Sequence, residues 1–97
     1  MTCGSQRRTT AGVVGTSGTA IRCFGYTMRS SAAGVGTVTL YDGTSTSGTE
    51  KWLGTGTQDG SADKVFGAKG KYFPNGLYAD FDGNVTYVDF DYVQETA

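Results

Sequence analysis

Hydrophobic and polar positions alternate most strictly near the C-terminal end of the chain, over residues 77–92. Two runs of period two are separated by Gly83-Asn84, a pair typical of a tight hairpin turn. We therefore predict a β-hairpin with one apolar face, because side chains alternate between the two faces of a strand. The opposite face of this hairpin is polar and collects Tyr78, Asp80, Asp82, Tyr87, Asp89 and Asp91.

Shorter apolar or alternating runs between small-residue turns predict five further strands. These strands cover residues 11–14, 19–29, 37–42, 49–55 and 64–68. The run over 19–29 has apolar residues on both faces, so we predict a central strand that bends or bulges at Gly25. About seven evenly spaced short strands, with almost no helix, indicate an all-β fold. We predict a small antiparallel β-sandwich, for which a jelly roll is one arrangement.

The length of 97 residues fits one domain with a single core. We assign residues 11–97 to the sandwich and residues 1–10 to an N-terminal arm. The arm carries the adjacent pair Arg7-Arg8 among polar residues, and no pattern there would bury it. It is expected either to be a disordered terminus or to become ordered on a partner.

Charge is unevenly distributed along a chain whose formal net charge is only −1. Residues 1–41 contain four arginines and no acid, whereas from Tyr72 onward there are acids and no base. The acids at this end are Asp80, Asp82, Asp89, Asp91 and Glu95. The two ends are thus complementary, and they either pair within one subunit or dock one subunit on another.

The sequence offers little for catalysis or cofactor chemistry. It contains no histidine, which removes Ser-His-Asp and Cys-His sites. Cys3 and Cys23 have neither disulfide-framework nor zinc-site spacing, so we expect a free thiol and a buried small side chain. Carboxylates on an open strand face lack the cleft that an acid/base pair needs. We expect no enzyme activity and no cofactor.

Two binding alternatives, calcium and a sugar, stay open at different strengths. The run Asp80-Phe81-Asp82-Gly83-Asn84 has oxygen ligands at alternate positions but departs from the calcium-loop pattern, which favours a solvated or partner-facing acidic surface. Trp52 could stack on a sugar ring, although a core or interface position is the ordinary interpretation. Aromatic residues interleaved with acids argue against nucleic acid, and no apolar run is long enough to span a membrane as a helix.

Three segments give a resemblance to a known class of proteins. They are the run from Gly67 to Val85, the run Ala20-Ile21-Arg22-Cys23-Phe24-Gly25-Tyr26, and the run Val38-Thr39-Leu40-Tyr41-Asp42-Gly43. In the order of a basic Gly loop, an aromatic residue, Asn-Gly-Leu and an acidic strand, the chain resembles small β-rich virion proteins of tailed bacteriophages. The similarity spans most of the chain and includes no catalytic motif.

This resemblance implies a structural, non-enzymatic role in a virion assembled in the host cytoplasm. A capsid decoration (cement) protein is the leading expectation, with a head-to-tail or tail component next and a carbohydrate-binding adhesion module as the rival from another class. The expected partners are the major capsid protein or another virion protein, and further copies of the chain, with a trimer considered. The expected partner-binding residues are Arg7, Arg8, Tyr78, Asp80, Tyr87, Asp89 and Asp91.

Overall fold

A computed structural model describes the backbone of residues 2–94 and the side chains of residues 5–94. Over this range the chain forms nine strands and no helix. The strands are β1 (Thr2–Arg8), β2 (Gly12–Val14), β3 (Ile21–Ser30), β4 (Thr37–Asp42), β5 (Thr49–Thr55), β6 (Ser61–Val65), β7 (Lys71–Phe73), β8 (Leu77–Phe81) and β9 (Val85–Gln94).

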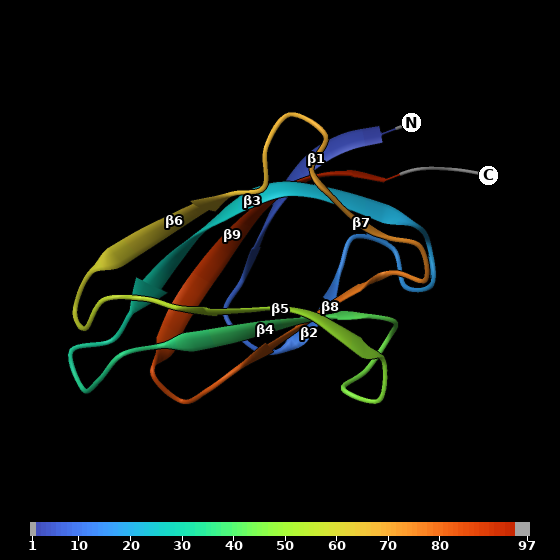
Figure 1. Ribbon diagram of the computed structural model, residues 1–97. Coiled ribbons are helices and arrows are strands. Elements are labelled where there is room, and N and C mark those ends of the chain that lie inside the picture. Colours follow the sequence, from blue (N-terminus) through green and yellow to red (C-terminus); the bar gives the residue numbers. More distant parts are fainter. Residues whose placement is uncertain (1, 95–97) are drawn as a thin grey trace.

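The strands form two antiparallel sheets packed face to face (Figure 1). A five-stranded sheet has the order β1-β9-β3-β6, with short β7 also paired to β3, and a four-stranded sheet has the order β2-β8-β4-β5. With β7 set aside, this interleaved order is that of a jelly roll. The predicted all-β sandwich is confirmed, with two strands more than the sequence indicated.

The core lies between the two sheets and is made by the inward-facing positions of both. Leu40 and Leu77 from the four-stranded sheet meet Ile21, Met28 and Phe90 from the five-stranded sheet, and all five are fully buried. Their polar neighbours along each strand point outward, because adjacent side chains alternate faces. The alternation seen in the sequence therefore identifies Leu77, Ala79, Val88 and Phe90 as core positions, whereas Phe81 and Tyr92, expected on the same apolar face, are only partly buried.

The predicted hairpin over 77–92 is wrong, because β8 and β9 lie in different sheets. The segment between them arches across the end of the sandwich: the Asp82 amide donates to the Thr37 carbonyl (3.2 Å), and the Ser31 amide donates to the Asn84 carbonyl (2.7 Å). The predicted pairing of β8 with β9 is wrong for a physical reason. Two strands with one apolar face each can bury it side by side in a hairpin or face to face across a core, and the period is the same in both cases.

Residues 2–8, expected to belong to an arm, instead form β1 along the edge of the five-stranded sheet. β1 pairs with β9 over seven residues in an antiparallel register that sets Arg7 opposite Asp89. The complementary charges of the two chain ends therefore meet within one molecule here. The sequence hid this strand because an edge strand with a polar outer face needs few apolar residues.

The remaining strands match the predictions unevenly. β3 is a central strand with a register shift between Cys23 and Gly25, as predicted. The strand expected over 64–68 ends earlier, because Gly67 has a φ of +91° that breaks an extended chain. β6 therefore covers Ser61–Val65, and β7, within a segment expected to be a loop, was missed.

Cys23 is fully buried and is a free thiol. The side chain of Cys3 lies outside the described residues, but its backbone pairs with Val93 on one side of β9 while Cys23 pairs with Tyr92 on the other. Two strand spacings, about 9–10 Å, separate such positions, which exceeds the reach of a disulfide.

Candidate interaction surfaces

The jelly-roll order divides the seven predicted partner-binding residues among three places. Arg7, Tyr87, Asp89 and Asp91 lie on the outer face of the five-stranded sheet. Tyr78 and Asp80 lie on the outer face of the four-stranded sheet, on the opposite side of the molecule. Arg8 lies at the side of the sandwich where β1 turns into β2. The single aromatic and acidic face expected from the hairpin therefore does not exist.

Arg7 contacts both Asp89 and Tyr87 within the chain. The Arg7 guanidinium donates from Nε and one Nη to the two Asp89 carboxylate oxygens, at 2.7 and 2.9 Å. Its carbon lies 4.0 Å from the centroid of the Tyr87 ring, a cation–π contact. The hydrogen bond from Arg7 lowers the pKa of Asp89, and the same bond raises the pKa of Arg7. This cluster fixes β1 on β9 and is engaged within the chain.

Arg8 is also engaged within the chain. Its guanidinium donates to the backbone carbonyls of Thr10 (3.1 Å), Ala11 (3.3 Å) and Val13 (3.3 Å). A Cβ on Gly12 would collide with this guanidinium, so the glycine leaves the space that the arginine fills. Arg8 therefore holds the β1–β2 crossover in place, a role that the sequence did not suggest.

The outer face of the four-stranded sheet carries a surface that we call the tyrosine face, made by Tyr41, Leu53, Tyr78 and Asp80. Tyr41 and Tyr78 are directly opposite on neighbouring strands, with ring centroids 6.5 Å apart and planes tilted by 60°. Leu53 on β5, which lies opposite Thr39 of β4, is 53% exposed. Tyrosine is among the residue types enriched at protein interfaces, and the exposed leucine adds apolar surface beside the pair.

The bulge in β3 hollows the outer face of the five-stranded sheet. This depression of about 320 Å³ is called the acidic depression after its two carboxylates, and its lining residues are Phe24, Gly25, Tyr26, Thr27, Asp63, Lys64, Val65 and Asp91. A Cβ on Gly25 would collide with the Lys64 carbonyl oxygen, so the strands approach closely beneath the hollow. Asp63 and Asp91 have no hydrogen-bond or ion-pair partner among the described residues. Of the residues around this depression, only Asp91 was predicted to bind a partner. The glycine within the strand, Gly25, was the sequence signal for the bulge that brings the other residues together.

The open side of the sandwich between β5 and β6 carries a lysine–aromatic edge, made by Lys51, Trp52, Lys64, Phe66 and Lys71. Trp52 and Phe66 form an edge-to-face pair with centroids 5.3 Å apart. The Lys64 ammonium lies 4.6 Å from the centroid of the Trp52 ring, and that of Lys71 lies 6.0 Å from the Phe66 ring. Sequence reasoning missed this edge because its lysines are far apart along the chain.

Trp52 therefore has the core-side position that is its ordinary interpretation. Its indole N–H donates to the Tyr26 hydroxyl at 2.9 Å, and its ring packs against the buried core. Burial raises the pKa of Tyr26, whose hydroxyl is accepting this bond. A sugar ring stacking on Trp52 would have to displace the Lys64 ammonium.

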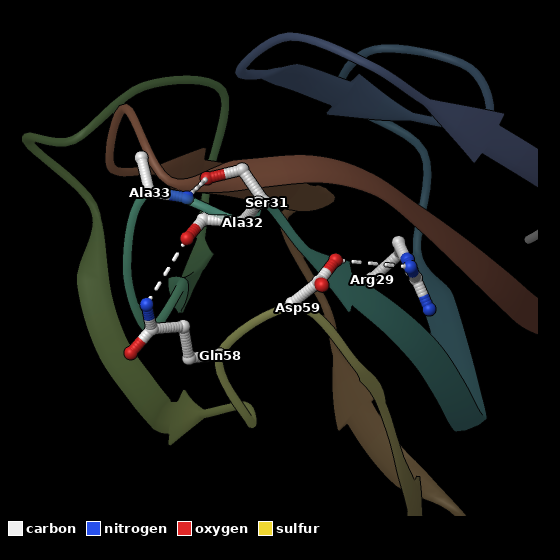
Figure 2. A network of polar contacts seen from close by, with 6 residues as sticks. All are labelled: Arg29, Ser31, Ala32, Ala33, Gln58 and Asp59. Atoms are coloured by element: carbon white, nitrogen blue, oxygen red, sulfur yellow. Dashed lines mark hydrogen bonds and ion pairs between the residues drawn. The ribbon is translucent and has the colours of Figure 1, made fainter.

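The loops at one end of the sandwich are held together by their own polar contacts (Figure 2). The Gln58 side chain donates to the Ala32 carbonyl (3.0 Å), and Arg29 lies 3.4 Å from the Asp59 carboxylate. The Asp59 amide donates to the Ser31 carbonyl (2.9 Å), and its φ of +51° completes a tight turn. These groups therefore have partners within the chain.

Residues 5–94 contain no group of three or more His, Cys, Asp or Glu side chains arranged to hold a metal ion. In the run Asp80–Asn84, the Asp82 carboxylate accepts a hydrogen bond from the backbone amide of Asn84 (3.0 Å), which is the ordinary bond of an Asx turn. Within the described range, no helix is long and apolar enough to cross a membrane.

The folded chain thus carries three surfaces of differing chemistry: the tyrosine face, the acidic depression and the lysine–aromatic edge. Comparison with protein-family models, with curated proteins and with solved structures found no match for this chain.

Proposed function

We propose that this chain is a non-enzymatic structural protein of a phage virion that decorates the capsid and attaches through its tyrosine face. The partner is the major capsid protein or another virion protein. The observation that carries the proposal is the exposed Leu53 beside the Tyr41–Tyr78 pair on the outer face of the four-stranded sheet. An apolar and aromatic patch rimmed by Glu50 and Asp80 has the composition of a protein interface.

Two further observations support this function. The jelly roll is a fold of viral capsid and lectin domains, an analogy that raises the prior for a structural role without assigning it. The resemblance in the order of motifs to small phage virion proteins points the same way. A decoration protein that binds only the assembled shell stabilises the shell relative to its free subunits. An interface of standard size, about 800 Å² per partner, would be enough for such binding.

Leu53→Glu tests the attachment. Leu53 is more than half exposed, so the variant should fold like the parent while placing a charge in the interface. We expect its occupancy on native particles stripped of the chain to fall by about tenfold or more, which corresponds to about 1.4 kcal/mol. The matched control is Val35→Glu, a substitution at a 44% exposed apolar residue in a loop.

Electron microscopy of the same particles locates the bound copies. Regular density over the head, lost with Leu53→Glu and kept with Val35→Glu, is the expected result. Copies confined to a fibre or tail tip would contradict the decoration role, and equal binding by both variants would contradict the tyrosine face as the attachment surface.

A further inference from the structure

The lysine–aromatic edge is a concentration of positive charge without carboxylate partners. Within the described residues, the ion pairs involve Arg7 and Arg29 but none of the three lysines. Lys51 donates to the Tyr72 carbonyl (2.7 Å), and the ammonium groups of Lys64 and Lys71 lie against aromatic rings. The ammonium groups thus surround half-buried aromatic rings, an arrangement that favours an anionic partner.

The acidic depression is the complementary surface on the same molecule. Among the described residues, Asp63 and Asp91 are exposed carboxylates without side-chain partners. Val65, two positions after Asp63 on β6 and across Gly25 from Asp91, is the most exposed large apolar residue of this range, at 73%. A partner that brought lysines here would neutralise the carboxylates and cover the valine.

Both surfaces share one strand. β6 is the last strand on the β3 side of the five-stranded sheet; Lys64 points to the inner side of this strand, and Asp63 and Val65 point to the outer side. Two complementary patches that adjoin each other can both be satisfied in one contact with a second copy related by a two-fold axis. A head-to-tail contact would leave one patch open at each end.

We infer that the occupant of the lysine–aromatic edge is a second copy of this chain, in a two-fold dimer in which the lysines of each copy contact the acidic depression of the other. The contact is made by side chains, not by joining the two β6 strands into one sheet. If the two β6 strands paired about Asp63 or about Lys64, that residue would lie opposite the same residue of the second copy. Two like charges would then be side by side, which opposes strand pairing.

Charge reversal in the isolated chain tests this dimer, whether or not the chain binds a capsid. One variant carries Lys64→Glu and Lys71→Glu, and the other carries Asp63→Lys and Asp91→Lys. Each alone should be monomeric in sedimentation equilibrium at concentrations where the parent is a dimer. An equimolar mixture should form a heterodimer, because the reversed charges are complementary again. The parent's dissociation constant should rise about tenfold or more between about 50 mM and 500 mM salt.

A matched control reverses two acids elsewhere, with Asp80→Lys and Asp82→Lys, and should leave the dimer intact. Near-ultraviolet circular dichroism checks that each variant is folded. If a double variant is unfolded, the single variants Lys71→Glu and Asp91→Lys replace it in the same mixing experiment. A parent that is monomeric up to about 100 μM, a trimer or open polymer, or folded variants that fail to combine would each overturn the dimer.

Discussion

At the scale of single residues, the side chains that looked most available for binding are largely used inside the fold. Arg7 and Asp89 pair with each other, and Arg8 is bound to three backbone carbonyls. Two carboxylates are left without partners among the described residues: Asp91, which the sequence had indicated, and Asp63, which became apparent only once the strands were placed. Availability for a partner is thus a property of the folded neighbourhood, since a charge already satisfied gains little from a new contact.

Cys23 illustrates how burial controls chemistry at one residue. Burial raises the pKa of its thiol to about 11, whereas an unfolded chain would have a value near 8.5. Because the folded value is the higher one, the stability contributed by the neutral thiol is complete below about pH 8.5. It is lost as the pH rises through about 11.

We therefore predict that Cys23 resists alkylation in the native state. In a Cys3→Ser background at about pH 8, iodoacetamide should modify Cys23 slowly in buffer and rapidly in denaturant, because the thiolate is the reactive species and the folded core disfavours it. Mass spectrometry measures the two rates. Equal rates in both conditions would show that Cys23 is not a core residue.

At the scale of elements, strand positions were more predictable than strand partners. The ranges 37–42 and 49–55 and the bulge in β3 were correct, because alternation and in-strand glycines are local signals. β1 and β7 escaped because one has few apolar residues and the other has three residues in total. The partners of β8 and β9 could not be read from alternation, since both pairings bury the same faces.

The predicted partner-binding surface depended on the pairing of β8 with β9. Tyr78, Asp80 and Asp91 were correctly placed on the outer sides of their strands. Their assignment to one surface failed with the hairpin. Lys51, Lys64 and Lys71 were invisible as a group because no period relates their positions, and only the two sheets bring them to one edge.

The attachment of β1 depends on Arg8 more than on Arg7. Arg8→Ala removes the donors for three carbonyls beside the β1–β2 crossover, two of them on half-buried residues, and should lower the free energy of unfolding by about 1–3 kcal/mol. Arg7→Ala removes an exposed ion pair and should have the smaller effect. Urea unfolding of both variants and the parent measures the difference. The reverse order would refute the role of Arg8 as the crossover's anchor.

At the scale of the whole molecule, β8 and β9 lie in different sheets. The acidic residues that the sequence assigned to one hairpin face are therefore divided between the outer faces of the two sheets. The proposed attachment uses the tyrosine face of one sheet, and the proposed dimer uses the charged groups on and beside the other sheet. A small domain exposes a large share of its surface after folding, so contacts with partners are an efficient way to gain stability. The proposed attachment and the proposed dimer use different surfaces, and each can fail independently.

The placement of β8 and β9 in opposite sheets is the claim on which these surfaces depend, and disulfide formation tests it directly. In a Cys3→Ser, Cys23→Ala background, cysteines at Thr39 and Asp80 are opposite one another on paired strands. They should form an intramolecular disulfide under mild oxidation. Cysteines at Asp80 and Tyr87 would be opposite in the hairpin, but here they point outward from different sheets and should stay reduced. Mass spectrometry of the two proteins gives the answer: a disulfide in the 39/80 variant alone is the predicted result, and a disulfide in the 80/87 variant alone would contradict the jelly roll.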